Sequence, residues 1–86
     1  MDIHPDLRHF TNHQPIIEVA GKNVGACLED LILRFPDIKP ELFDVNNKLR
    51  IHIDVYVNTE SSYPDELKTP VKDGDRLTIV IPLIGG

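Results

Sequence analysis

One amphipathic helix, expected over residues 24–35, limits how a chain of 86 residues can build a core. Asn23 is a good N-cap because its side-chain oxygen can accept a hydrogen bond from the first helical turn. Pro36 is expected to end the helix, since proline disfavours helical geometry in the residue before it. A single apolar stripe of this kind must be buried against a second layer. The stripe, at helical spacing, comprises Val24, Cys27, Leu28, Leu31, Ile32 and Phe35.

Four segments have strand patterns that can supply this second layer. In residues 50–58, Ile and Val alternate with polar side chains, which is the period of two of a strand. Residues 16–20 form a shorter β-rich run, and a further short strand is expected around Ile3. Residues 76–81 follow an Asp-Gly-Asp turn signal at 73–75. Apolar or β-branched side chains on both faces of 76–81 predict an interior strand.

The expected order is therefore short strand, strand, helix, long strand, loop and strand. One helix laid across one sheet is the two-layer arrangement available to a chain of this size. We predict an α+β roll of the β-grasp (ubiquitin-like) type, in which one main helix packs across a mixed sheet of four to five strands. Residues 1–82 are expected to form the domain and residues 83–86 a flexible C-terminal tail.

Composition excludes several classes of function. The net charge is −5 and the nine Lys and Arg residues are scattered, which argues against nucleic-acid binding. No apolar run approaches the ~18 residues of a membrane span, and the N-terminus lacks the pattern of a signal peptide. A single cysteine excludes an internal disulfide framework and fits a reducing environment. We therefore expect a cytoplasmic protein that binds neither nucleic acid nor membrane.

The sequence ends in Gly85-Gly86, directly behind an apolar run. Two glycines lack Cβ atoms and form a ribbon no wider than the backbone, which can thread a narrow channel and offers an unhindered acyl group. A terminal Gly-Gly alone is also typical of a frayed chain end. The apolar residues before it favour a partner that covers them. The expected docking residues are Ile79, Ile81, Pro82, Leu83 and Ile84.

Several short motifs match one known pattern. They are Leu7-Arg8 with Thr11 and Gln14, Val24-Gly25, Val55-Tyr56-Val57-Asn58, Thr69-Pro70-Val71-Lys72-Asp73-Gly74-Asp75 and the terminal Gly85-Gly86. With them the chain resembles the MoaD/ThiS family of ubiquitin-like sulfur carriers over nearly its whole length. The Leu-Arg opening looks most like the branch that donates sulfur for cysteine or related thio-metabolite synthesis.

The resemblance implies a mechanism in which Gly86 carries the sulfur and Gly85 threads the channel of a partner. An E1-like adenylating enzyme would use ATP and magnesium to join AMP to the Gly86 carboxylate. A sulfur donor would then replace AMP, and the resulting thiocarboxylate would be consumed by a sulfur-accepting enzyme that makes cysteine, thiamine or a related thio-metabolite. The chain itself would bind no cofactor, supply no catalytic residue and act as a co-substrate, not an enzyme.

Three alternatives remain open at this point. The chain is also compatible with the small subunit of molybdopterin synthase, whose tail inserts into a larger catalytic subunit. It is compatible with a protein modifier whose Gly86 forms isopeptide bonds with lysines. A plain binding module with an incidental tail is the third alternative.

The other chemistry-bearing side chains are interpreted as structural. Cys27 lies on the apolar stripe and is expected to pack in the core. Asp73 and Asp75 are expected to bond local backbone, and residues 12–13 to form the turn between the first two strands. The carboxylates of the Pro-punctuated connection 36–44 are expected to form a solvated surface with no acid–base pair; these are Asp37, Glu41 and Asp44. No closed ligand set accompanies the histidines of the N-terminal segment, so we predict no metal site; these are His4, His9 and His13.

Overall fold

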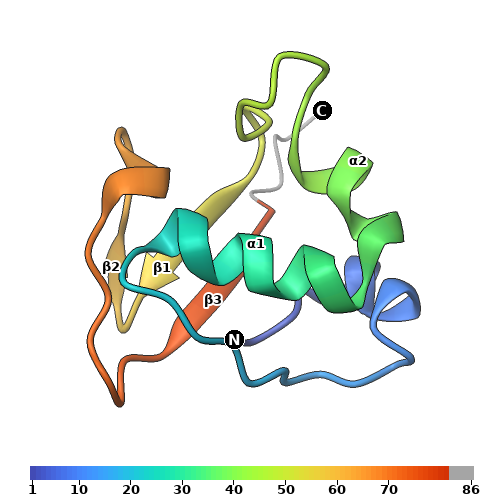
Figure 1. Ribbon diagram of the computed structural model, residues 1–86, viewed down its shortest axis with the longest axis horizontal. Helices are drawn as coiled ribbons and strands as arrows, with labels where there is room; N and C mark the ends of the chain where they lie inside the picture. Colours follow the sequence, from blue (N-terminus) through green and yellow to red (C-terminus); the bar gives the residue numbers. More distant parts are fainter. Residues whose placement is uncertain (82–86) are drawn as a thin grey trace.

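The computed structural model describes residues 1–81. Figure 1 shows one long helix, α1 (Val24–Arg34), lying across one face of a sheet. The sheet has the order β2-β1-β3, and β1 pairs antiparallel with both neighbours. The strands are β1 (Asp54–Val57), β2 (Glu60–Ser61) and β3 (Leu77–Val80). The short helical turns are η1 (Pro5–Phe10), η2 (Pro36–Ile38), α2 (Lys39–Leu42) and η3 (Glu66–Lys68).

The helix α1 begins and ends where the sequence predicts. The Asn23 side-chain oxygen accepts a hydrogen bond from the Ala26 N–H at 2.7 Å, which caps the first turn. Phe35, which precedes Pro36, leaves the helical region with φ −133° and ψ 72°.

The core forms between α1 and the sheet, and it contains most of the predicted apolar stripe. Val24, Leu28 and Leu31 are fully buried, and each contributes roughly 1.5–3 kcal/mol of apolar burial. The sheet supplies Val55 and Ile79 to the same cluster. Cys27 is buried as predicted, and this burial raises the pKa of its thiol.

The strand predicted around Ile3 is reduced to one residue that bridges two segments. Asp2 pairs in parallel with Thr78 of β3 and antiparallel with Ile16. The Asp2 N–H donates to the Leu77 carbonyl at 2.7 Å. β3 is therefore an interior strand, as predicted. The expected count of four to five strands was wrong for residues 1–81, because only three segments pair over more than a single bridge.

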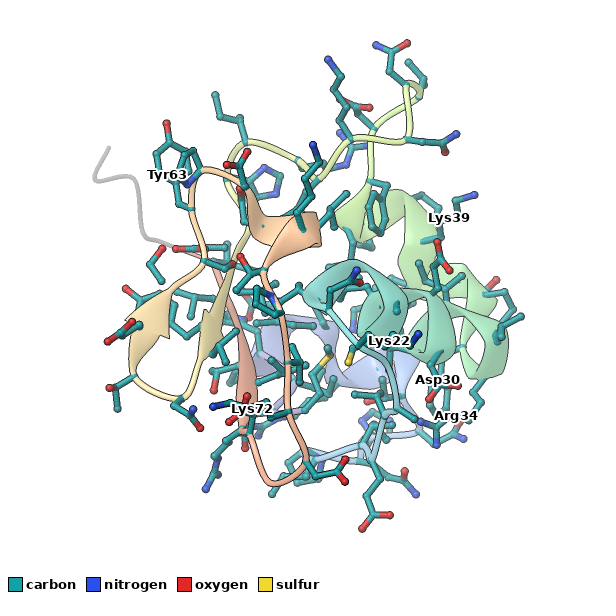
Figure 2. The ribbon with its side chains drawn as sticks, turned by 60° about the vertical axis from the view of Figure 1, so that its left-hand side comes forward. Lys22, Asp30, Arg34, Lys39, Tyr63 and Lys72 are labelled. Carbon is teal, nitrogen blue, oxygen red and sulfur yellow. The ribbon has the colours of Figure 1, made fainter. Side chains whose placement is uncertain are left out.

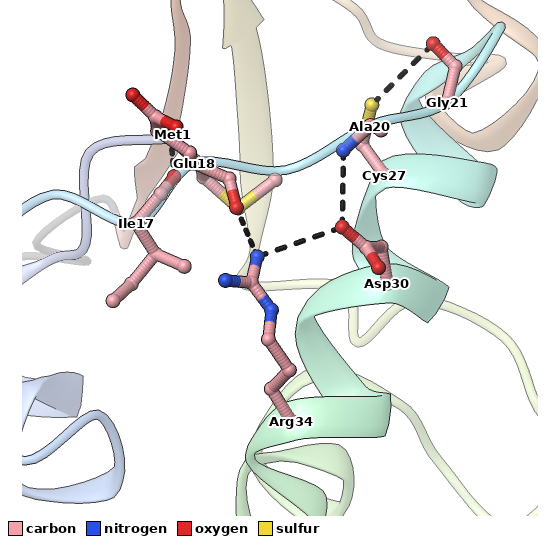
Figure 3. A network of polar contacts seen from close by, with 8 residues as sticks. All are labelled: Met1, Ile17, Glu18, Ala20, Gly21, Cys27, Asp30 and Arg34. Atoms are coloured by element: carbon pink, nitrogen blue, oxygen red, sulfur yellow. Dashed lines mark hydrogen bonds and ion pairs between the residues drawn. The ribbon is translucent and has the colours of Figure 1, made fainter.

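The strand predicted over residues 16–20 was wrong beyond its first two residues. Ile16 pairs with Asp2 and the Ile17 N–H donates to the Met1 carbonyl at 2.9 Å, whereas from Glu18 to Ala20 side chains of α1 take the place of a neighbouring strand (Figure 3). The Asp30 carboxylate accepts from the Ala20 N–H at 3.0 Å. The Arg34 guanidinium donates to the Glu18 carbonyl and lies 3.5 Å from the Asp30 carboxylate. These side chains hold residues 18–20 against the helix and occupy the Glu18 carbonyl and the Ala20 N–H, which a longer strand would pair with its neighbour.

The strand predicted from Arg50 begins later, at Asp54. The Ile53 N–H donates to the Arg50 carbonyl at 2.9 Å, so the chain turns before the strand starts. Arg50 is held in this turn by a hydrogen bond from its Nε to the Pro40 carbonyl at 2.8 Å. As a result the Ile51 side chain is completely exposed, although the alternation of apolar and polar residues in 50–58 predicts that it faces the core.

Two segments for which no helix was predicted contain helical turns. The connection 36–44 forms η2 and α2, which bury Ile38 and Leu42 while leaving the carboxylates of the connection largely in solvent. The N-terminal segment forms η1 in the same way around buried Leu7. Asn12 and His13 follow it with φ of 54° and 62°, which confirms the predicted turn.

Candidate functional site

The predicted sulfur attachment residue, Gly86, lies outside the described residues. The same is true of Gly85 and of three predicted docking residues, which are Pro82, Leu83 and Ile84. The structure describes the strand β3 and the half-buried Ile81 from which these residues continue.

The base of the tail is held from both sides. On one side β1 pairs with β3 along its whole length, up to Asp54 opposite Val80. On the other side the Ile79 N–H donates to the Asp2 carbonyl at 3.1 Å. Main-chain hydrogen bonds therefore fix β3, the last described strand, on both edges.

A bidentate ion pair adds to this support. The Arg76 guanidinium donates to both Asp2 carboxylate oxygens, at 2.6 and 2.8 Å. Thr78 Oγ1 lies at 3.5 Å from the same carboxylate. The hydrogen bonds from Arg76, together with its charge, hold the pKa of the Asp2 carboxyl below its usual range against the opposing effect of burial.

We expect Asp2→Asn to lower the urea midpoint of unfolding modestly at neutral pH. The folded pKa of Asp2 is depressed, so its contribution to stability is complete above the unfolded pKa of about 3.9 and is lost as the pH falls through the folded pKa. The difference between the variant and the original chain should therefore vanish in acid. Asp37→Asn, at an exposed carboxylate, is the matched control and should leave the urea midpoint unchanged both at neutral pH and in acid. A difference that persisted at low pH would contradict the ion-pair explanation.

The face of the sheet turned away from α1 includes Val80, the last residue of β3, which is followed by Ile81 at the end of the described part of the chain. Side chains alternate along a strand, and Val55 of β1 faces the core. The two cross-strand pairs that flank Val55, Asp54 with Val80 and Tyr56 with Thr78, therefore lie on the outer face. We call it the open face and define it by four half-buried residues, Asp54, Tyr56, Thr78 and Val80.

The charges of the open face are largely satisfied within the molecule. The Asp54 carboxylate accepts from the Val55 N–H at 2.7 Å and from the Ser61 hydroxyl. Asp2, beside Thr78, is neutralised by Arg76. The open face therefore presents an aromatic and aliphatic centre between paired polar groups, which suits protein docking better than acid–base chemistry.

One predicted docking residue is misassigned. Ile79 is 1% exposed and packs in the core, so it cannot contact a partner. Its neighbours Thr78 and Val80 point to the open face instead.

The structure supports the structural interpretation of most of the other candidates. Asp75 accepts from the Lys72 N–H at 2.8 Å and from the Asn58 amide, and these bonds lower the pKa of its carboxyl. Asp73 makes no comparable bond within residues 1–81, so only half of that prediction holds. The His4 imidazole accepts from the Asp6 N–H at 3.1 Å. In the part of the chain that the structure describes, no three His, Cys, Asp or Glu side chains cluster as metal ligands.

Comparison with known proteins identifies relatives of the whole chain. The model of the ThiS family matches residues 5–86. A chain in the crystal structure of the Amycolatopsis orientalis BexX/CysO complex is 36% identical, with a TM-score of 0.88, and the match covers 99% of this chain and 96% of that one. Mycobacterium tuberculosis CysO, described as an antigen, is 30% identical with a TM-score of 0.86, covering 95% and 96%.

A third solved structure is a protein modifier. SAMP1 from Haloferax volcanii is 26% identical, with a TM-score of 0.79, and the match covers 99% of this chain and 94% of that one. A search of curated protein sequences finds no significant match. The structural matches confirm the predicted β-grasp class. Among residues 1–81, no helix has the length and apolar character needed to cross a bilayer.

Proposed function

The chain belongs to the ThiS family, and we propose on this basis that it is a sulfur carrier activated at the Gly86 carboxylate. The observation that carries the proposal is the link between the interior strand β3 and the terminal Gly85-Gly86. A strand anchored on both edges fixes the place on the domain from which the side-chain-free terminus continues. That arrangement serves a protein whose chain end is the reacting group.

The proposed chemistry needs activation because a C-terminal carboxylate has a pKa of about 3.3–3.7 and is anionic at neutral pH. An E1-like enzyme, using ATP and magnesium, joins AMP to the Gly86 carboxylate and releases pyrophosphate. A hydrosulfide donor then attacks the acyl carbon, the carbon–oxygen bond to AMP breaks, and AMP leaves. The product is a thiocarboxylate on Gly86.

The open face is the surface that we assign to the activating enzyme. It adjoins the origin of the tail, since Val80 is its last member in β3. Tyr56 and Val80 offer apolar contact on this face, whereas the half-buried Ile81 packs against the core cluster. The Amycolatopsis orientalis neighbour belongs to a BexX/CysO complex, which supports a protein partner for this chain as well.

The carrier acts in this proposal as a co-substrate. The thiocarboxylate is consumed by a sulfur-accepting biosynthetic enzyme of cysteine, thiamine or related thio-metabolite synthesis. The 36% and 30% identity with chains from structures named for CysO favours the cysteine-type branch. A reducing cytoplasm suits a thiocarboxylate because oxidation would couple it to other sulfur groups.

Intact mass spectrometry tests the proposal. After incubation with the activating enzyme, ATP, magnesium and sulfide, the protein should gain the mass difference between sulfur and oxygen. Oxidation of Met1 or Cys27 produces a similar shift, so the modification must be alkylated and localised to the C-terminal peptide. Omission of ATP should abolish it. A chain that forms no thiocarboxylate with any ThiS-family activating enzyme would contradict the proposal.

A second function, protein modification, is favoured by one observation. The Haloferax volcanii structure is that of a small archaeal modifier protein, and it is 26% identical to this chain. In that case Gly86 would form isopeptide bonds with lysines of other proteins. Conjugates of high mass in a lysate of the source cells, absent when Gly86 is deleted, would establish this function.

A further inference from the structure

A groove of about 700 Å³ lies beside the outer surface of α1, and none of the four residues of the open face lines it. α1, η2, α2 and η3 all contribute to its walls, together with the loop that follows α2. The four main apolar lining residues are Ile32, Leu33, Phe43 and Leu67. They come from segments far apart in the sequence, so the groove is a product of the fold.

Leu33 is the least expected of these residues. It lies on α1, but its side chain is 81% exposed, whereas the buried side of the helix packs against the sheet. Ile32, Phe43 and Leu67 are half-buried next to it, so the exposed leucine continues an apolar surface. A continuous exposed apolar surface with a polar rim is typical of a protein interaction site.

The rim of the groove carries one charge of each sign. Glu29 and Lys39 both line it and both are exposed. Neither forms an ion pair within residues 1–81. Figure 2 shows Lys39 beside α2, directed away from the core. Both charges are therefore available to an opposite charge on a bound molecule.

The composition of the groove favours a protein segment over a small metabolite. Small-molecule sites combine an apolar lining with a few converging polar groups that fix the orientation of the ligand. Here the charged groups lie on the rim, and every buried polar side-chain atom in the described part of the chain already has a hydrogen-bond partner. Apolar contacts in the groove with charges at its edge match the binding of an amphipathic helix.

We infer that the groove binds a short amphipathic helix of a partner protein. Along α1 the lining extends from Gly25 to Leu33, which at 1.5 Å per residue is about 12 Å, or about two helical turns. The partner helix would place apolar side chains, spaced i and i+4, on Leu33 and Phe43. A basic side chain would face Glu29 and an acidic one would face Lys39.

This site extends the proposed function but does not depend on it. α1 covers one face of the sheet, and the open face lies on the other (Figure 1). A partner in the groove therefore leaves the open face and β3 accessible. The chain can be held by one protein through the groove while a second protein binds the open face, whatever chemistry takes place at Gly86.

A synthetic peptide tests the inference with the full chain. The probe is an alanine-based helix of about 15 residues with leucines at i, i+4 and i+7, a lysine at one end and a glutamate at the other. Titration followed by amide NMR should give shifts that cluster around α1, α2 and η3. We expect Leu33→Lys to weaken binding at least about tenfold, since it places a charge in the apolar centre. Folding should be unaffected because Leu33 is exposed.

Two control experiments distinguish binding in the groove from nonspecific binding of the peptide. Ile51→Lys introduces the same charge at an exposed isoleucine that does not line the groove, and should leave binding unchanged. Glu29→Lys should weaken binding, and a peptide with glutamate in place of its lysine should recover it. Shifts on the open face, equal loss in both lysine variants, or no saturable binding would overturn the inference. Self-association of the free chain that Leu33→Lys abolishes would also overturn it, because a second copy would then be the occupant.

Discussion

Deletion of Gly86 is expected to reduce thiocarboxylate formation by at least about 100-fold. Removal of one residue withdraws the acyl carbon by roughly 3.3–3.6 Å, the span of one extended residue. A displacement of even 1 Å from the reacting position can cost about 100-fold in rate. Initial rates of C-terminal thiocarboxylate formation, measured by mass spectrometry with a fixed amount of activating enzyme, give the comparison.

The thermal midpoint of this variant should equal that of the original chain. The core cluster and the sheet described here lie within residues 1–81, well before the deleted residue. A second variant, with one serine added after Gly86, moves the terminal acyl carbon in the opposite direction and should lose activity equally. Gly86→Ala tests the need for an unhindered acyl group, and we expect a loss of at least about tenfold from one methyl group. Normal activation of the shortened chain would show that Gly86 is not the reacting residue.

Ile79→Ala is expected to lower the free energy of unfolding by about 2–5 kcal/mol. The side chain is 1% exposed and belongs to the core cluster, so its truncation leaves a cavity between β3 and α1. Part of the activation would also be lost, because β3 supports the tail. The rate of activation should return toward that of the original chain when the temperature is lowered far enough to restore the folded population.

Ile51→Ala is the matched control for this variant. Ile51 has the same chemistry and the same apparent alternation in the sequence, yet it is fully exposed. We expect its truncation to change stability by no more than about 0.5 kcal/mol. Urea unfolding followed by circular dichroism gives both values. Equal effects at the two positions would contradict the observed burial, and a loss of docking by Ile79→Ala without loss of stability would restore its original assignment.

Predictions that depend on neighbouring residues were the accurate ones. The Asn23 cap, the end of α1 before Pro36 and the turn around Gly74, which has φ +88°, all follow from atoms only a few residues apart. The chain entropy lost in forming such contacts is small, so local sequence is sufficient to determine them. The apolar stripe of α1 belongs to the same class, because helical periodicity alone specifies which residues share a face.

Predictions that require distant partners were less accurate. Asp2 lies beside Thr78, 76 residues later, and no local pattern indicates that pairing. The segment 16–20 has strand character, but only Ile16 and Ile17 pair with the N-terminal residues, and Asp30 and Arg34 supply the hydrogen bonds of Ala20 and Glu18 from a helix. Propensity predicts an extended backbone without specifying which group will satisfy it.

The sequence by itself determined the class of fold and marked Gly86 as the candidate reacting residue, because helical periodicity, turn residues and side-chain-free glycines act locally. Only the tertiary structure decided that Ile79 is buried and Ile51 exposed, and that a groove remains beside Leu33. Burial depends on where the whole chain turns and which segments meet. An isoleucine is therefore a core residue or a surface residue according to neighbours that the local sequence does not contain.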